Sequence, residues 1–220
     1  MTWLYSFVHA SRAFYKDITI IKMKINKNIH PWKACLPLNS GRDALECIHF
    51  KGRYAYASNA LIAIRVSVES LIYLQDWEMA TEDINGYVDI LSGYSIHAKV
   101  LKMFASLGDF KITAPDGIPT LTAKIGFNEI SASLVKSGQI KAPDIASALV
   151  PNQERKPIEK IGINPEMLKD LTDALGLSDV RLDFTTADNK IFIHSDMNEF
   201  DTNMGIIMPK IITASIPGFE

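Results

Sequence analysis

A chain of 220 residues is long enough for one large domain or two modest ones. Hydrophobic residues make up 47% of it and charged residues 22%, which excludes the disordered and fibrous classes. The formal net charge of -2 gives no overall basic field, so a nucleic-acid partner would have to meet a local basic patch.

The sequence lacks the motifs of several kinds of functional site. Cys35 and Cys47 have no CxxC or Cys/His spacing, which favours free thiols in a cytoplasmic chain over a disulfide. The five histidines lack metal-ligand spacing, and no phosphate loop or nucleophile motif occurs. No window approaches the roughly 18 apolar residues of a membrane span. We therefore expect a protein that is not an enzyme, with no metal, no cofactor and no membrane partner.

The first part of the chain predicts a strand, a helix and three strands. The opening strand covers 18–25, and Met23 looks like its natural beginning, so residues 1–22 are interpreted as an N-terminal extension. Pro31 suits the start of a helix over 29–38, and turn residues follow it. Three runs rich in β-branched and aromatic residues then predict strands, at 45–50, 53–57 and 61–68.

The same order recurs in the middle of the chain, after an acidic linker over 69–86 and a strand over 87–91. A helix is predicted from Ser95, as its N-cap, to Leu107, with Gly108 as its stop. Lys99 and Lys102 are predicted on its solvent face. Its apolar face is predicted to hold Ile96, Val100, Met103, Phe104 and Leu107. The strands of this copy are expected at 110–114, 121–127 and 129–135.

The third copy begins with a strand over 161–163, followed by the best-defined helix in the chain. Asn164 is its predicted N-cap, Pro165 its first residue and Gly176 its end. Its buried face is predicted to consist of Met167, Leu168, Leu171 and Leu175. The strands that follow are expected at 180–184, 190–194 and 205–212.

Three copies of a strand-helix-three-strand unit, with helices starting near residues 30, 96 and 165, indicate an α+β fold. The spacing is too long for a solenoid repeat and fits sheets that flank paired helices. The expected organisation is an extension over 1–22, a two-unit domain over 23–142, a connector over 143–157, a half-domain over 158–212 and a tail over 213–220.

Several segments carry a resemblance to a known family. Residues 162–168, 173–175, 180–182 and 206–209 resemble the final half-domain of the bacterial DNA polymerase III β subunit, the sliding clamp. Residues 42–50 and 57–59 are similar to the first half of its middle domain, and Pro143-Asp144 with 149–151 resembles the connector between the two domains. This chain has Ser58-Asn59-Ala60-Leu61-Ile62 where the family has Thr-Asp-Gly-His-Arg, and three units where the family has six.

The resemblance implies a DNA-clamp fold, whose helices offer Lys and Arg to duplex phosphates without reading bases. The residues expected at this DNA-binding face are Lys33, Lys99, Lys102 and Lys169. The alternative is that these lysines form an ordinary solvated helix face.

The resemblance also implies a hydrophobic pocket where polymerases and repair proteins dock short peptides. The residues expected to line it are Leu61, Ile62, Pro151, Ile206, Ile207, Met208 and Pro209. A Met-lined groove suits varied peptides because the thioether adapts its shape. The alternative is that the same residues fill the core.

The function implied is that of a sliding-clamp-like processivity factor in DNA replication, which tethers polymerase or repair partners to duplex DNA. The expected partners are duplex DNA, clamp-binding peptides and further copies of the chain, which ring closure would require. The alternative is a clamp-derived peptide-binding module that does not encircle DNA and recruits or competes for clamp partners.

Overall fold

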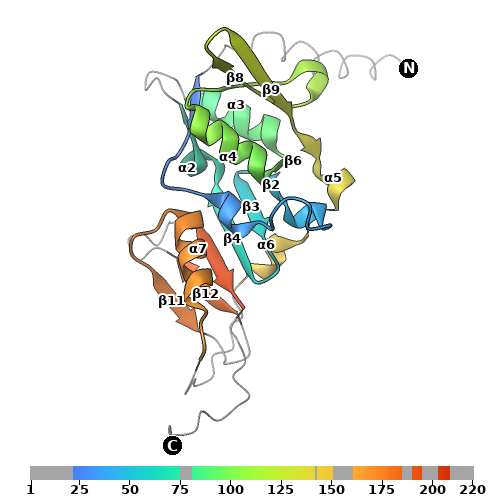
Figure 1. Cartoon of the computed structure of the whole chain (residues 1–220). Coiled ribbons are helices and arrows are strands. Elements are labelled where there is room, and N and C mark those ends of the chain that lie inside the picture. Colours follow the sequence, from blue (N-terminus) through green and yellow to red (C-terminus); the bar gives the residue numbers. More distant parts are fainter. Residues whose placement is uncertain are drawn as a thin grey trace, which may run out of the picture.

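The computed structural model of this chain describes residues 22–74, 81–141, 143–150, 161–184, 190–194 and 203–208 (Figure 1). The predictions for most of the extension 1–22, for the connector beyond Val150 and for the tail 213–220 lie outside these residues. Within the described residues, no helix is long and apolar enough to span a membrane.

One antiparallel sheet of eight strands takes strands from all three units of the described chain. The first and third units join in it through the pairing of β4 (Ile62–Ser67) with β13 (Met204–Ile207), in which Ile62 lies opposite Ile207. From one edge to the other, the strand order is β10 (Val135–Lys136), β6 (Tyr94–His97), β2 (Cys47–Lys51), β3 (Tyr54–Ser58), β4, β13, β12 (Ile191–His194) and β11 (Arg181–Phe184). The chain's last described strand therefore completes a sheet that its first unit begins.

The second unit forms a smaller sheet from β7 (Lys111–Thr113), β8 (Thr120–Ile125) and β9 (Asn128–Ser133). Beside it, β1 (Met23–Ile25) pairs with β5 (Ile72–Leu74). The backbones of Met23 and Phe110 exchange hydrogen bonds of 2.8 and 3.0 Å, so β1 continues the small sheet. Because β6 from the second unit joins β2 in the large sheet, the first two units exchange their opening strands.

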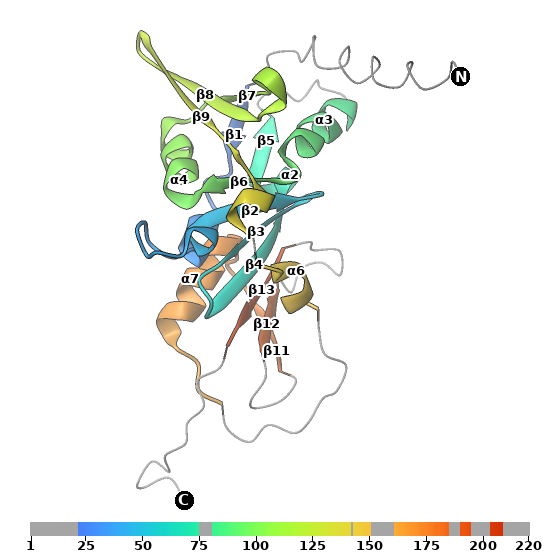
Figure 2. The same ribbon diagram turned by 90° about the vertical axis from the view of Figure 1, so that its right-hand side faces the viewer.

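Helices cover both faces of the large sheet. The 3₁₀ helix η1 (Pro31–Ala34) lies between α4 (Ala98–Leu107) and α7 (Pro165–Leu175) on one face, and α6 (Ile145–Ala148) lies on the other (Figures 1 and 2). The other helical elements are η2 (Asp43–Leu45), α2 (Val68–Leu71), α3 (Thr81–Leu91), η3 (Pro115–Gly117) and α5 (Ser137–Ile140).

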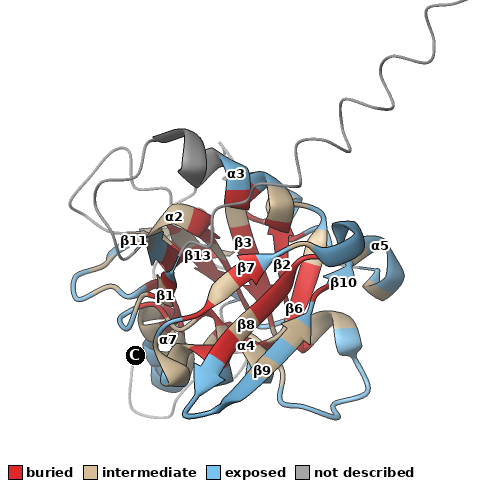
Figure 3. Cartoon of the chain, turned by 90° about the horizontal axis from the view of Figure 1, so that it is seen from above, coloured by how far each residue is buried: buried red, intermediate tan, exposed pale blue. Residues whose placement is uncertain are grey.

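Two hydrophobic clusters follow from this arrangement, because successive side chains of a strand point to opposite faces. The main core contains Phe50, Phe104 and Leu171, all 2% exposed or less. The smaller cluster lies under α6 and consists of Tyr56, Ala63, Ile145, Leu149, Phe192 and Ile206. Figure 3 shows the buried strands enclosed by exposed outer segments such as α5.

The α+β class is confirmed, and the third helix matches its prediction closely. Asn164 Oδ1 accepts a hydrogen bond of 2.9 Å from the backbone N–H of Glu166, and Pro165 is the first helical residue. Gly176 ends α7 in the left-handed conformation, with φ of 70°. A Cβ at this position would lie 2.8 Å from the carbonyl oxygen of Asn28, so only glycine lets the helix end pack there. The prediction of free thiols at Cys35 and Cys47 is also confirmed.

The predicted helix over 29–38 is wrong in extent, because only Pro31–Ala34 is helical. Cys35 is already extended, and Pro37 follows two residues later, where a helix would lack a backbone donor and would crowd the preceding turn. The strand predicted over 161–163 is also wrong, since it is reduced to a single bridge residue at Gly162.

The prediction for the segment before the second copy is also wrong. Thr81–Leu91 is helix α3, whose residues Tyr87, Val88 and Leu91 are buried, and not a linker that ends in a strand. Ser95 lies within β6, and His97 Nδ1 caps α4 by accepting from the N–H of Lys99 at 3.1 Å. The buried residues of α4 are Ala98, Leu101 and Phe104, while Met103 is 37% exposed.

Candidate functional site

A pocket of about 200 Å³ lies at the junction of β4, β13 and α6, where the first unit, the connector and the third unit meet. It combines an apolar floor with two charged side chains at its border. Its lining residues are Ser58, Ala60, Leu61, Ala63, Pro143, Asp144, Ile145, Ala148, Lys190, Ile206 and Met208.

The structure brings together three of the seven predicted pocket residues, namely Leu61, Ile206 and Met208. The prediction was wrong for Ile62 and Ile207, which are each 1% exposed and belong to the main core under α7. They lie opposite each other in the β4–β13 pairing, so both point away from the face that carries Ile206 and Ala63. Pro151 and Pro209 lie outside the described residues.

A tight turn before β4 presents Leu61 to solvent. Asn59 Oδ1 accepts hydrogen bonds from the N–H groups of Leu61 and Ile62, at 3.0 and 2.9 Å, which is the geometry of an Asx turn. Ala60 adopts a φ of 75°, in the left-handed region. Leu61 is consequently 49% exposed, and its carbonyl accepts a 2.9 Å hydrogen bond from the N–H of Met208, which is 43% exposed.

The opposite wall of the pocket comes from the start of α6, a helix within the segment that the sequence predicts as a connector. Asp144 caps this helix by accepting from Ser147, and that side-chain hydrogen bond is the main cause that lowers the pKa of Asp144. Lys190 donates to the carbonyl of Ala148 at 2.8 Å, which fastens β12 to α6. The spacing of Ile145 and Leu149, four residues apart and both buried, is the signal that could have revealed a helix here.

The four lysines predicted to contact DNA lie on the helical face formed by α4, η1 and α7. Lys99 and Lys102 are exposed on α4, and Lys169 is exposed on α7. Lys33, on η1, is hydrogen-bonded to Asp173 and lies 3.9 Å from a carboxylate oxygen of Asp170. The carboxylates of α7 therefore offset much of the positive charge that Lys33 brings to this face.

His30 sits within the same face and stays neutral more readily than an exposed histidine. Burial is the main cause that lowers the pKa of His30, followed by the positive charge of Lys33, and Lys102 acts in the same direction. Its ring packs 5.1 Å from the ring of Trp32. Lys33 and Lys102 are thus close enough to share one surface.

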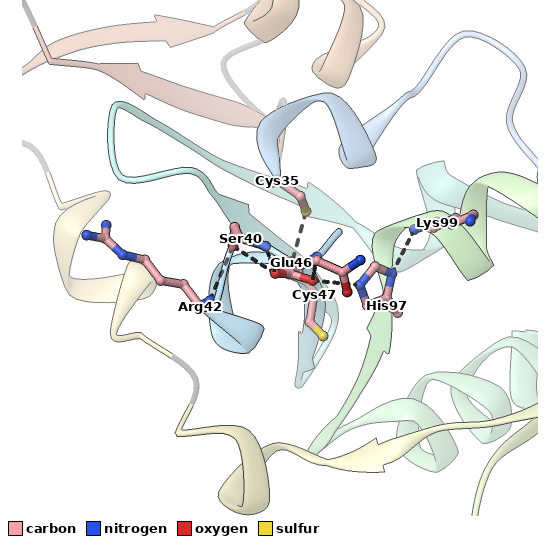
Figure 4. A network of polar contacts seen from close by, with 8 residues as sticks. Cys35, Ser40, Arg42, Glu46, Cys47, His97 and Lys99 are labelled. Atoms are coloured by element: carbon pink, nitrogen blue, oxygen red, sulfur yellow. Dashed lines mark hydrogen bonds and ion pairs between the residues drawn. The ribbon is translucent and has the colours of Figure 1, made fainter. Parts of the chain in front are cut away.

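A carboxylate network fixes the start of α4 relative to the first unit (Figure 4). Glu46, 3% exposed, accepts from the N–H and hydroxyl of Ser40 at 2.6 and 2.7 Å and contacts His97 Nε2 at 3.2 Å. Hydrogen bonds from the side chains of Ser40 and His97 lower the pKa of Glu46 to about 2. Glu46 thus holds the residue that caps α4, two positions before Lys99.

A metal centre is absent from the part of the chain that the structure describes. Among the described residues, no group of three or more His, Cys, Asp or Glu side chains could hold a metal ion.

The exchanged opening strands, the sheet shared across units and the helices aligned on one face define a DNA-clamp fold, that of the bacterial sliding clamps. The structure is similar to the H. pylori β clamp in complex with diflunisal, with a TM-score of 0.54 over 89% of this chain at 11% identity. It is also similar to the Bacillus subtilis DNA polymerase sliding clamp, with a TM-score of 0.53 over 90% of this chain at 14% identity.

A third similar structure is the Bartonella birtlesii sliding clamp bound to griselimycin, with a TM-score of 0.53 over 88% of this chain at 15% identity. The matches cover 68%, 65% and 67% of these three clamp chains, so this chain spans about two thirds of their length. No family model and no curated protein matches the sequence.

Proposed function

We propose that this chain is a clamp-like, non-enzymatic protein of DNA replication that acts in the cytoplasm and tethers polymerase or repair partners to duplex DNA. The DNA-clamp fold supports this role, since the similar structures are DNA polymerase clamps. The pocket at the β4–β13 junction would hold a partner peptide, and the α4–η1–α7 face would lie toward DNA. Lysine contacts to phosphates would make that binding independent of sequence and sensitive to salt.

The observation that carries the proposal is the exposure of Leu61 and Met208 side by side at the pocket. Both are large apolar side chains that the fold leaves 49% and 43% exposed, and a backbone hydrogen bond fixes their spacing. Behind them, Ile206 supplies a buried apolar floor. Apolar anchors of a partner peptide that cover such residues gain the free energy of desolvation, which is typical of interface hot spots.

The test of the pocket is a titration of a fluorescein-labelled clamp-binding peptide, followed by anisotropy, with griselimycin as a second probe. Met208→Ala and Leu61→Ser should each weaken binding about tenfold, the equivalent of about 1.4 kcal/mol. Their exposure means that neither change should unfold the protein. Ile118→Ser is the matched control, because Ile118 is 41% exposed and does not line the pocket. Equal affinity for the wild type and both pocket variants would refute the peptide site.

A second candidate function is favoured by the charge balance of the helical face. Because Asp173 and Asp170 lie against Lys33, this face is less basic than a row of four lysines alone would be. We therefore propose, as the alternative, a clamp-derived module that binds partner peptides without encircling DNA.

Two measurements separate these functions. The clamp proposal expects a homo-oligomer by sedimentation at micromolar concentration, and greater retention on circular than on linearised duplex DNA. A strict monomer whose retention is the same on both DNA forms would rule out the ring, while peptide binding that depends on Met208 would then support the module.

A further inference from the structure

A groove of about 740 Å³ lies away from both sites above. It lies where β1 and β5 meet the sheet of β7, β8 and β9, near the end of α4 (Figure 2). The residues that line it are Lys22, Lys24, Ile25, Lys27, Tyr73, Ala105, Leu107, Gly108, Asp109, Phe110, Lys111, Thr122, Ala123, Lys124 and Glu129.

Five lysines face this groove against two carboxylates. Lys24 forms an ion pair of 3.3 Å with Asp109, and Lys124 lies opposite Glu129 across β8 and β9. Among the ion pairs of the described residues, none involves Lys22, Lys27, Lys111 or Lys124. The groove therefore keeps an excess of positive charge in a chain whose net charge is negative.

Strand register places these groups on the outward faces of the two small sheets. Lys24 pairs with Tyr73, and Lys111 pairs with Thr122, two positions before Lys124 on β8. The alternate residues Ile112 and Leu121 are buried in the core. Since the hydrogen bonds between Met23 and Phe110 join the two sheets, Lys24 and Lys111 belong to one continuous basic surface.

The groove also offers an aromatic face. Tyr73 is 40% exposed and lies directly across from Lys24 in the β1–β5 pair. Stacking of bases on an aromatic ring beside lysines that follow the phosphates is the usual design of a single-strand site. A cavity of 740 Å³ has the size of a ligand pocket and not of a surface that holds a duplex. An acidic peptide would use the lysines but would gain little from Tyr73.

We propose that the groove bounded by Lys24, Tyr73, Lys111 and Lys124 binds single-stranded nucleic acid, with its lysines on the phosphates and Tyr73 stacked on a base. This site is separate from the helical face proposed for duplex DNA and from the peptide pocket. Its existence does not depend on whether the chain forms a ring.

The experiment uses the full chain and a fluorescein-labelled oligothymidine of about 15 nucleotides, followed by anisotropy over a range of salt concentrations. Lys111→Glu combined with Lys124→Glu should weaken binding at least about tenfold. Lys111→Gln combined with Lys124→Gln should reduce the slope of log K against log salt by about 1.4, since each phosphate contact to a single strand contributes about 0.7. Tyr73→Ser should weaken binding about tenfold without changing that slope.

The matched control is Lys136→Glu combined with Lys141→Glu, which makes the same charge change at two exposed lysines beside α5, outside the groove and outside the helical face. This pair should retain most of the single-strand affinity. Thermal unfolding of every variant checks that the fold is kept, and the glutamine pair covers the case in which charge reversal disturbs the sheet.

Three results would overturn the proposal. The first is wild-type affinity in both groove pairs, and the second is an equal loss in the Lys136–Lys141 control. The third is competition by polyglutamate as effective as that by oligothymidine at equal charge, which would indicate an acidic polypeptide as the occupant. None of these results bears on the circular-DNA test or the Met208 titration, so the two proposals fail separately.

Discussion

Lys33 on η1 is hydrogen-bonded to Asp173 on α7, 140 residues further along the chain. This contact joins the first and third units on the helical face, beside the backbone hydrogen bond of 3.1 Å from His30 N–H to the Asp173 carbonyl. The hydrogen bond from Lys33 is the main cause that lowers the pKa of Asp173. A lysine expected to bind DNA is therefore already partnered within the protein.

Asp173→Asn should release Lys33 and strengthen binding to duplex DNA. We expect the slope of log K against log salt to steepen by about 0.9, the value of one added phosphate contact. Because the pair is partly exposed, the loss of stability should be only about 0–1 kcal/mol. Asp116→Asn, on the exposed η3, removes the same charge away from Lys33 and should leave the slope unchanged. An unchanged slope for Asp173→Asn would mean that Lys33 does not reach DNA.

The hydrogen bonds of Glu46 should make the stability of the folded protein depend on pH. The folded-state pKa of Glu46 is lowered from 4.5 to about 2, so its stabilising effect is complete above about pH 4.5 and disappears as the pH falls toward 2. Glu46→Gln should lower the Tm at pH 7 and bring the two proteins closer together at pH 3. Glu166→Gln, exposed at the start of α7, serves as the control. A constant Tm difference from pH 7 to pH 3 would contradict this account.

Ala60→Gly should stabilise the protein, because Ala60 holds a left-handed backbone with φ of 75°. Relief of this conformation outweighs the added flexibility of the unfolded chain and leaves a net gain of about 0.5–1 kcal/mol. Ala105→Gly in α4 should instead cost about 0.5–1 kcal/mol. Urea unfolding of both variants measures the difference, and a loss of stability in Ala60→Gly would show that the methyl group makes a favourable contact at the pocket.

Gly205→Ala should destabilise the junction of the first and third units. A Cβ on Gly205 would lie 2.7 Å from Leu171 Cδ1 and 3.1 Å from the carbonyl oxygen of Ala63. Such overpacking typically costs about 1–3 kcal/mol. Gly138→Ala, which meets no atom within 4 Å, is the matched control and should be close to neutral. The cost of Gly205→Ala should be smaller when it is measured in a Leu171→Ala background. If the cost were the same in both backgrounds, the collision with Leu171 would not be its cause.

Elements marked by several local signals could be predicted from the sequence. Helix α7 has an N-cap, a proline at its first position and a terminal glycine, and its boundaries were predicted correctly. The helix predicted over 29–38 is too long, because Pro37 disfavours helical structure in the residues just before it. The prediction for the α3 segment failed because adjacent apolar residues such as Tyr87 and Val88 fit a buried strand as well as a helix.

The candidate site could be predicted only in part, for a reason that lies in the geometry of strands. The resemblance located the run that ends at Met208, but it could not decide which residues face the pocket. That choice depends on the register of Ile206 against Ala63, set by two segments far apart in the chain. The groove at Lys111 and Lys124 was missed because its lysines come from separate strands and form no run in the sequence.

The pairing of β4 with β13 has a consequence for how the chain is made. During synthesis, β4 emerges early, with its Ile62-Ala63-Ile64 run unpaired on the side that β13 will occupy, and β13 emerges after every other described element. Contacts so distant in sequence form slowly, because the intervening loop must close first. A nascent chain would therefore expose an unpaired strand edge until β13 has been synthesised, which is the period when chaperones would protect it.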